Sequence, residues 1–285
     1  MVLPRLRALP VIRRYPATAV VTAVRARGLR DDFRPVRSFL LFVGHPRSGH
    51  SLVGALIDAH PNALVAHELD ALKYVEAGFG RDQLYTLILR HQRARAADGL
   101  RSGSGYAYAV PGQWQGRYQR LEVIGDKKGG RSTMRLASQL DLFDRLTSAV
   151  GVPVKVVQVV RNPYDNIATM FRRGHRRPLS EHADNYFELA TTVRALRERI
   201  DADHFHELRL ETLIAEPTTT LTRLTGFLGL DASPDYLAAS GAVVFPTARR
   251  TRTDAPWTPE LLDLVARRAS EHPGLDGYGF AEAVG

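Results

Sequence analysis

Short apolar runs that end abruptly and are followed by helical patterns constrain the fold of this 285-residue chain more than any other feature. Residues 39–43, FLLFV, stop at Gly44, and residues 154–160, VKVVQVV, are rich in β-branched side chains. Buried parallel strands have this continuous apolar character, and helices connect them. We therefore predict an α/β fold of three layers, a central parallel sheet flanked by helices. Further strands are predicted over residues 63–66, 121–125 and 207–210, and helices over residues 50–60, 82–97, 131–147, 164–174, 181–200, 217–228 and 259–270.

The first 37 residues differ in composition from the rest of the chain. They contain nine arginines against Asp31 and Asp32, and so supply most of the formal net charge of +9. We predict a basic N-terminal extension over residues 1–37 and a single domain over residues 38–285. Its prolines interrupt any long helix, and it lacks the continuous apolar stretch of a secretory signal. The segment therefore predicts either contact with an anionic membrane surface or a poorly ordered or locally packed extension.

Composition excludes several classes of function. The chain contains no cysteine, which excludes disulfide scaffolds, thiolate metal sites and cysteine nucleophiles. No apolar run approaches the roughly 20 residues of a membrane-spanning helix. Basic residues gather in one terminal segment instead of spreading over a face with aromatic residues, so we expect no nucleic-acid partner. The absence of cysteine does not indicate a compartment. We predict a cytoplasmic location, with peripheral membrane association as the alternative.

A glycine-containing loop joins the first strand to the first helix of the predicted domain. Residues 44–51, GHPRSGHS, have the spacing G-x-x-x-x-G-x-S of a phosphate-binding P-loop. His50 stands where a nucleotide triphosphatase requires a lysine, and the cation of this loop is Arg47 instead. Backbone amides and a helix N-terminus in this setting bind phosphate or sulfate. The loop therefore predicts a P-loop-type fold with an anion site that is poorly suited to ATP hydrolysis, and the alternative is an ordinary turn.

A second cationic position follows the strand over residues 154–160. Arg161 ends this strand, Pro163 begins the next helix, and Thr169 lies one to two turns into it. Strand ends in open α/β sheets border the crevice that binds ligands. Arg161 and Thr169 are therefore predicted to bind a second phosphate group.

These segments carry a resemblance to a known family. PRSGHSLVGALIDAHP and VVRNPYDNIATMF resemble the two nucleotide-binding signatures of sulfotransferases that use 3′-phosphoadenosine 5′-phosphosulfate (PAPS), most closely the protein-tyrosine, Golgi-type and bacterial branches. A third segment, LRLETLIAEPTTTLTRLTGFLGL, is similar to a structural signature of the same family. Together they span residues 39–230. The resemblance implies that the first loop holds the 5′-phosphosulfate, and that an arginine with a hydroxyl residue eight positions later holds the 3′-phosphate.

The resemblance also implies roles for single residues. Glu68 is the predicted general base, with His67 as its competitor, and Lys127 or its neighbour Lys128 is the predicted active-site lysine. Donor-binding residues are predicted to be Arg47, Ser48, Gly49, His50, Ser51, Arg161 and Thr169. Arg47 and Lys127 are also predicted catalytic residues that stabilise the negative charge developing on the transferred group. His50 is also predicted to alter the donor geometry or to supply a proton-sensitive catalytic contact. Arg249, Arg250 and Arg252 are predicted 3′-phosphate or substrate contacts, with a solvated run of charge as the alternative.

The predicted reaction moves a sulfuryl group from PAPS to a hydroxyl of a carbohydrate, a lipid or a small alcohol or phenol, and releases 3′,5′-ADP without a metal ion. One alternative is a small-molecule kinase built on a P-loop, and another is a catalytically idle nucleotide-binding protein. The loop over residues 99–120, with Tyr106, Tyr108, Trp114 and Tyr118, is predicted to contact the acceptor or to pack on its own domain.

Overall fold

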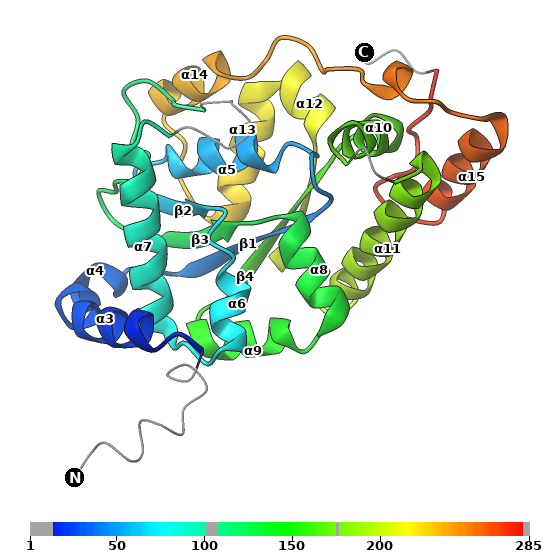
Figure 1. Ribbon diagram of the computed structural model, residues 1–285. Helices are drawn as coiled ribbons and strands as arrows, with labels where there is room; N and C mark the ends of the chain where they lie inside the picture. The colour runs from blue at the N-terminus through cyan, green and yellow to red at the C-terminus, as the bar shows by residue number, and fades with distance from the viewer. Residues whose placement is uncertain (1–13, 101–107, 175–176, 282–285) are drawn as a thin grey trace.

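The computed structural model describes residues 14–100, 108–174 and 177–281. Its centre is a five-stranded sheet in the order β2-β3-β1-β4-β5, with every neighbouring pair parallel (Figure 1). The strands are β1 (Ser38–Gly44), β2 (Ala63–His67), β3 (Val123–Lys127), β4 (Val154–Val160) and β5 (Phe205–Arg209). The predicted parallel sheet with flanking helices is confirmed.

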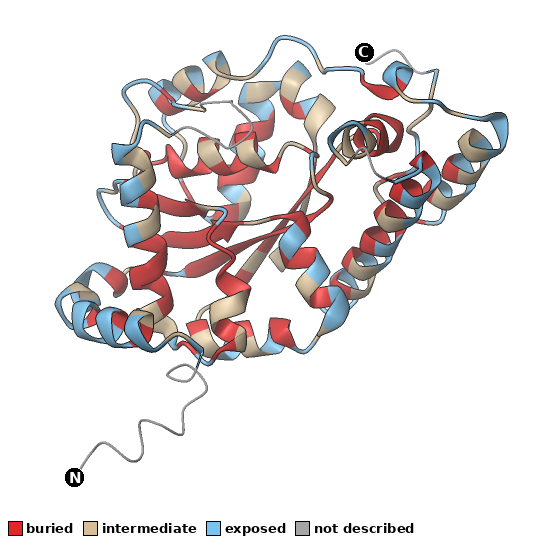
Figure 2. Cartoon of the chain, in the orientation of Figure 1, coloured by how far each residue is buried: buried red, intermediate tan, exposed pale blue. Residues whose placement is uncertain are grey.

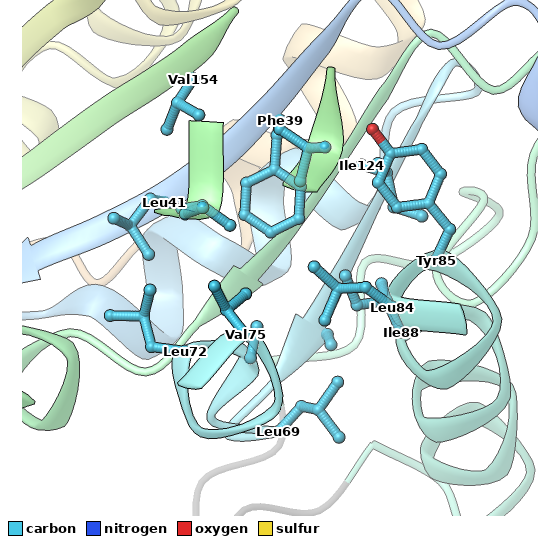
Figure 3. Packing of buried hydrophobic residues seen from close by; sticks show 14 of the residues in the cluster. Phe39, Leu41, Leu69, Leu72, Val75, Leu84, Tyr85, Ile88, Ile124 and Val154 are labelled. Carbon is cyan, nitrogen blue, oxygen red and sulfur yellow. The ribbon is translucent and has the colours of Figure 1, made fainter. Parts of the chain in front are cut away.

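Side chains of β1 divide the core between the two faces of the sheet. Phe39 and Leu41 point into one apolar cluster and Leu40 and Phe42 into another, and all four are fully buried. A central strand of a parallel sheet is covered on both faces, which explains its continuous apolar run. Figure 2 shows the sheet as the most deeply buried layer, and Figure 3 shows Phe39 and Leu41 packed against the helical side chains of the first cluster.

Helices cover each face of this sheet. The first cluster takes its helical side chains from α3 (Pro16–Ala26), α4 (Arg30–Phe33), α6 (Ala71–Glu76), α7 (Arg81–Ala97), α8 (Gly130–Ser138), α9 (Leu142–Val150) and α11 (Leu179–Arg197). The second takes them from α5 (His50–Asp58), α12 (Leu210–Ala215), α13 (Pro217–Leu228) and α14 (Pro234–Ala242). A third cluster packs α10 (Pro163–Arg173) and α15 (Pro259–Ser270) on the other side of α11. The described residues also contain short 3₁₀ turns at Arg27–Leu29, Ala202–His204 and Arg252–Asp254.

Two predicted elements are corrected. The single helix predicted over residues 131–147 is two helices, because the chain becomes extended at Gln139, with φ −156°, and then turns. The break lets α8 pack on β1 while α9 packs on α6. The strand predicted over residues 121–125 lies two residues later, since its last residues, Asp126 and Lys127, continue the parallel ladder although they are charged.

The described part of the predicted N-terminal extension is helical and packed. Pro16 stands in the first turn of α3, where its missing N–H costs nothing, so it begins a helix instead of preventing one. Ala19, Phe33 and Val36 are buried in the first cluster, against α7 among others. Residues 16–36 therefore match the locally packed alternative, and the boundary at residue 38 stays a prediction. Within the described residues, no helix is both long and apolar enough to cross a membrane.

Gly125 makes the contact between β3 and β1 possible, and this yields a stability prediction. A Cβ at Gly125 would collide with the backbone carbonyl oxygen of its ladder partner Leu40, an atom that cannot rotate away. Gly125→Ala should therefore lower the free energy of unfolding by about 1–3 kcal/mol, as overpacked core substitutions do.

Gly226→Ala is the matched control. Gly226 lies inside α13 with open space around the position of a Cβ. Alanine should raise stability there by about 0.4–1 kcal/mol, because it restricts the unfolded chain. Urea unfolding followed by circular dichroism measures both changes, and equal effects of the two substitutions would contradict the assigned contact.

Candidate functional site

The predicted site residues come from loops at the carboxyl ends of four neighbouring strands. β1 leads into the glycine-containing loop, β2 into Glu68, β3 ends at Lys127 and β4 leads into Arg161. Since the strands are parallel, these ends share one edge of the sheet. The register aligns His67 of β2 directly with Lys127 of β3, so Glu68 emerges beside the lysine.

The loop after β1 has the geometry of an anion site. Gly44, Arg47 and Gly49 have positive φ values of 121°, 72° and 105°, so the chain curls back before α5 begins. Within the described residues, the amides of residues 47–51 donate no hydrogen bond. The Arg47 side chain is exposed. A helix N-terminus with several unengaged N–H groups and a nearby guanidinium can bind a phosphate or a sulfate.

His50 holds this loop from inside. Its Nε2 donates to the Val43 carbonyl oxygen at 2.8 Å, and its Nδ1 lies 3.1 Å from Ser48 Oγ. The ring fills the space beside Gly44 and Gly129, where a Cβ on Gly129 would lie 2.6 Å from Nδ1. Burial lowers the pKa of His50 to about 4, so the imidazole is neutral near pH 7. This geometry departs from the predicted proton-sensitive catalytic contact, because both ring nitrogens are engaged in supporting the loop.

Glu68 and the two lysines form a charged cluster beside that loop. The Lys127 ammonium pairs with one carboxylate oxygen of Glu68, and Lys128 Nζ lies 2.6 Å from the other. Lys127 Nζ also donates to Ser51 Oγ at 3.1 Å, which links the cluster to α5. The Lys127 side chain is 2% exposed and that of Lys128 24%. Of the two predicted lysines, Lys127 is therefore the one that reaches both the carboxylate and the loop helix.

The pairing changes the acidity of Glu68. Burial alone would raise its pKa, but the charges and hydrogen bonds of Lys127 and Lys128 together lower the pKa to about 2. Burial lowers the pKa of Lys127, and the Glu68 carboxylate opposes that change. Glu68 is therefore fully ionised near pH 7 and held as a carboxylate by two ammonium groups.

Asp126 fixes the turn that carries Glu68. Both Glu68 and Asp70 have positive φ, at 69° and 66°, a conformation that costs free energy in residues other than glycine. The buried side chain of Asp126 accepts hydrogen bonds from the backbone amides of Leu69, at 3.1 Å, and Ala71, at 2.7 Å. Arg135 binds both carboxylate oxygens of Asp70, at 2.7 and 2.8 Å. The sequence reading missed Asp126, although a carboxylate beside two scarce lysines at a strand end was an available signal.

Arg161 and Thr169 come together as predicted from their spacing. Arg161 Nη1 donates to Thr169 Oγ1 at 3.1 Å and lies 3.4 Å from the Arg47 carbonyl oxygen. Its other terminal nitrogen donates to the Arg249 carbonyl oxygen at 2.6 Å and to Thr251 Oγ1 at 3.3 Å. The guanidinium therefore lies between the first loop and the C-terminal segment.

The C-terminal segment is fastened by Asp165, a residue that the sequence reading missed. The carboxylate of Asp165 accepts hydrogen bonds from the backbone amides of Thr251 and Arg252, at 2.7 and 2.8 Å. It also accepts one from the Arg252 guanidinium, at 2.9 Å. Both side chains of this ion pair are almost completely buried. Arg252 is therefore a structural residue, which corrects its prediction as a phosphate or substrate contact. Arg249 and Arg250 are exposed, and their predicted contacts stay predictions.

A hollow opens beside Lys127 and Ser51. The polar residues that line it are Ser51, His67, Gln92, Arg95, Gln115 and Lys127, together with Tyr108. Burial, with the charges of Lys127 and Arg95, lowers the pKa of His67 to about 3, so its imidazole is neutral and poorly basic.

The loop aromatic residues have different positions. Tyr108 lines the hollow, whereas Trp114 lies under the Arg117 guanidinium and Tyr118 packs on the first core cluster. Tyr106 lies outside the described residues. Of the described residues in this loop, Tyr108 is therefore the aromatic side chain placed to contact a molecule in the hollow.

Comparisons with known proteins agree with this architecture. Residues 153–234, which include Arg161 and Thr169, match the sequence model of a sulfotransferase family. The sulfotransferase domain of the curacin biosynthetic pathway superposes with a TM-score of 0.52 at 15% identity, covering 83% of this chain and 97% of that one. Sulfotransferase STF9 from Mycobacterium avium gives 0.50 at 11% identity, covering 92% and 82%. No curated protein sequence matches the chain. The family match and the shared fold confirm the predicted resemblance to sulfotransferases.

The buried imidazole of His50 gives the loop a pH dependence. Its pKa falls from 6.5 to about 4 on folding, so the unfolded chain takes up the proton first as pH decreases. As the pH falls from 6.5 to 4, the free energy of unfolding of wild type should therefore decrease by an amount that is absent in His50→Asn. The variant should be less stable at pH 7, by about 1–3 kcal/mol for the lost buried hydrogen bonds, and this difference should narrow toward pH 4.

Thr133→Val is the control, because Thr133 Oγ1 bonds both the amide and the carbonyl group of Gly44 without titrating. Chemical unfolding at several pH values measures both differences. The difference in unfolding free energy between wild type and Thr133→Val should not change with pH. If the difference between wild type and His50→Asn were equally constant, it would contradict a buried, neutral ring at His50.

Proposed function

We propose that this chain, whose matched family and fold are those of sulfotransferases, moves the sulfuryl group of PAPS to an acceptor hydroxyl with Glu68 as general base. The observation that carries the proposal is the connection from α5 through Ser51 and Lys127 to Glu68. It joins an anion-binding loop to a carboxylate through a buried cation. Transfer of a sulfuryl group requires these three components next to one another.

The donor is proposed to lie along the edge of the sheet. The amides of residues 47–51, the Arg47 guanidinium and the Ser51 hydroxyl would hold the 5′-phosphosulfate at the N-terminus of α5. Arg161 and Thr169 would hold the 3′-phosphate, and Arg249 and Arg250 are proposed to add contacts from the C-terminal segment. The hydrogen bond from Arg161 to the Arg47 carbonyl oxygen supports this arrangement, because the residues proposed to hold the two phosphates then lie side by side.

The proposed reaction is an in-line displacement at sulfur. The acceptor oxygen forms a bond to sulfur, the bond between sulfur and the 5′-phosphate oxygen breaks, and the bond electrons leave with 3′,5′-ADP. The hydroxyl proton passes to the Glu68 carboxylate. Lys127 and Arg47 would stabilise the negative charge that develops on the sulfuryl and leaving oxygens, a contribution of roughly 3 kcal/mol for each well-placed group.

Lys127 also controls when Glu68 becomes basic. A carboxylate with a pKa of about 2 is a weak proton acceptor, and the ideal pKa lies near the working pH. Sulfuryl oxygens near Ser51 would compete with Glu68 for the Lys127 ammonium. The loss of this ion pair raises the pKa of Glu68, so we infer that the donor itself prepares the base.

The two alternatives are less well supported. A kinase loop requires a lysine that reaches the β- and γ-phosphates, and the buried, neutral ring of His50 occupies that position. An idle binding protein has no use for a carboxylate on a turn with two positive φ values, because that conformation must be stabilised by Asp126 and Arg135.

The acceptor is proposed to enter the hollow beside Lys127. Its polar lining, which includes Gln92, Gln115 and the Tyr108 side chain, suits the hydroxyl of a small alcohol or phenol, or of one end of a carbohydrate or lipid. We also propose peripheral membrane contact through residues 1–37 and a cytoplasmic location.

Calorimetric titration tests the donor site. Wild type should bind 3′,5′-ADP more tightly than 5′-AMP, and Mg·ATP weakly. Arg161→Ala should weaken 3′,5′-ADP by about 10–100-fold and 5′-AMP by much less, because hydrogen bonds to charged groups contribute about 1.5–3 kcal/mol.

Arg173→Ala, an exposed arginine at the end of α10, the helix that carries Thr169, is the control and should change neither affinity. Equal losses of both nucleotides in Arg161→Ala would reject the 3′-phosphate assignment. A wild-type preference for Mg·ATP would favour the kinase, and no binding of any nucleotide would refute the proposal.

The substitution Glu68→Gln distinguishes the proposed role of Glu68 as general base from a role in donor binding. The amide cannot accept the hydroxyl proton, so turnover with PAPS and a phenolic acceptor should fall by about 10²–10⁴-fold. Affinity for 3′,5′-ADP should stay within a few-fold of wild type, because Lys127 remains in place.

Glu198→Gln at an exposed position is the control for the loss of one negative charge. Unchanged turnover in Glu68→Gln, alongside an active control, would place the base at another residue.

A further inference from the structure

The N-terminal helix α3 is apolar on both of its faces, which is unusual for a surface helix. Ala19, Thr22 and Ala26 form the buried face and pack toward α7. The opposite face consists of Ala17, Val20, Val21 and Val24, at the spacing i, i+3, i+4, i+7. Val20 and Val24 are 57% and 60% exposed, among the few large apolar residues exposed on the described surface. The buried face explains the packing of α3, whereas no other element among the described residues covers the outer valines.

The helix is firmly attached to the domain. Gln83 of α7 donates to the Ala19 carbonyl oxygen at 3.0 Å, and Arg81 donates to that of Phe33 at 2.9 Å. Arg14 pairs with Glu76 of α6 at 2.9 Å. The valines therefore project from a fixed element, and their exposure does not result from fraying of a chain end.

The segment that contains α3 is rich in arginine. The described segment over residues 14–37 contains six arginines and two aspartates, and residues 1–13 add Arg5, Arg7 and Arg13 with no acidic residue. Arg25 and Arg27 are exposed and form no ion pair within the described part of the chain. Arg30 and Arg34 are 71% and 83% exposed and meet aspartates only at 3.9 and 3.7 Å.

The exposed valines and the exposed arginines together indicate which kind of partner the outer face of α3 would bind. A second copy of the same face would bring arginines against arginines, which disfavours self-association. Aliphatic side chains between solvated guanidinium groups suit the boundary between phospholipid headgroups and acyl chains, where apolar residues enter the membrane and arginines meet phosphate. We propose that the outer face of α3, with Arg25 and Arg27, docks the protein on the surface of a bilayer that contains anionic phospholipids.

The position of α3 is compatible with activity at such a surface. α3 and α4 lie beside the amino-terminal end of β1, at the opposite end of the sheet from the glycine-containing loop (Figure 1). Figure 2 shows the outer turns of α3 as exposed. Docking there would leave the loop edge open to donor and acceptor. The inference deepens the membrane contact in the proposed function, and its test requires no turnover.

Co-sedimentation of the full chain with vesicles tests the proposal. Wild type should bind vesicles with one third phosphatidylserine at least ten-fold more tightly than phosphatidylcholine vesicles, and salt should weaken this binding. Val24→Asp should abolish most of the binding. Met134→Asp is its matched control, since it removes an exposed apolar side chain on α8 and adds the same charge. That control should bind like wild type.

A second pair of variants keeps the test valid if Val24→Asp folds poorly. Arg25→Gln with Arg27→Gln should weaken binding several-fold more than Arg223→Gln with Arg267→Gln, which removes two exposed arginines from α13 and α15. Equal losses in both pairs, or equal binding to both vesicle types, would overturn the proposal. A dimer that dissociates in Val24→Asp would also overturn it, and would assign the face to self-association. Failure of vesicle binding with normal 3′,5′-ADP binding would leave the proposed reaction intact.

Discussion

The ion pair between Lys127 and Glu68 determines the geometry of the whole site. An ammonium that is 2% exposed loses almost all hydration, so it must be compensated by oxygen partners in fixed positions. Its partners are Ser51 in the first turn of α5 and Glu68 directly after β2, and one buried side chain therefore ties that helix and that turn to the end of β3. α5 leaves room for the side chain through Gly54, where a Cβ would lie 2.7 Å from Lys127 Cγ. A glycine inside a helix is otherwise unfavourable, and this contact explains it.

The buried lysine also explains how the loop functions without a lysine of its own. In a nucleotide triphosphatase, the cation extends from the loop itself. Here the neutral ring of His50 supports the loop, and the positive charge reaches it from the neighbouring strand through Lys127 and Ser51. Lys127 is therefore shared between the proposed anion site and Glu68, which a lysine in the loop would not achieve. The histidine and the lysine are parts of one arrangement, although 77 residues separate them in the sequence.

The sequence predicted those features whose signals are local. β4, α13 and α15 have the predicted bounds or nearly so, because a β-branched run, a proline start or a glycine end marks each of them. Motif spacing predicted that Arg161 would meet Thr169. Asp126, Asp165 and Arg252 were missed or misassigned because their roles depend on partners far along the chain, such as the amides of Leu69 and Thr251. A charged residue in a loop gives no sign of whether it is buried, and Arg252 was consequently read as a ligand. The short helices α6, α12 and α14 escaped prediction because tertiary packing stabilises them more than propensity does.

The charges of the cluster imply an order of events in the proposed reaction. Without donor, two ammonium groups hold Glu68 as a carboxylate with a pKa of about 2, and an acceptor hydroxyl would keep its proton. The donor brings several negative charges to the loop and competes for Lys127, so the carboxylate loses its strongest partner while Lys128, which is more exposed, retains part of the charge balance. The proposed base would therefore gain strength only when the group to be transferred is present. A site built in this way activates the acceptor after the donor has bound, and the same ion pair that fixes the empty site prevents its carboxylate from acting prematurely.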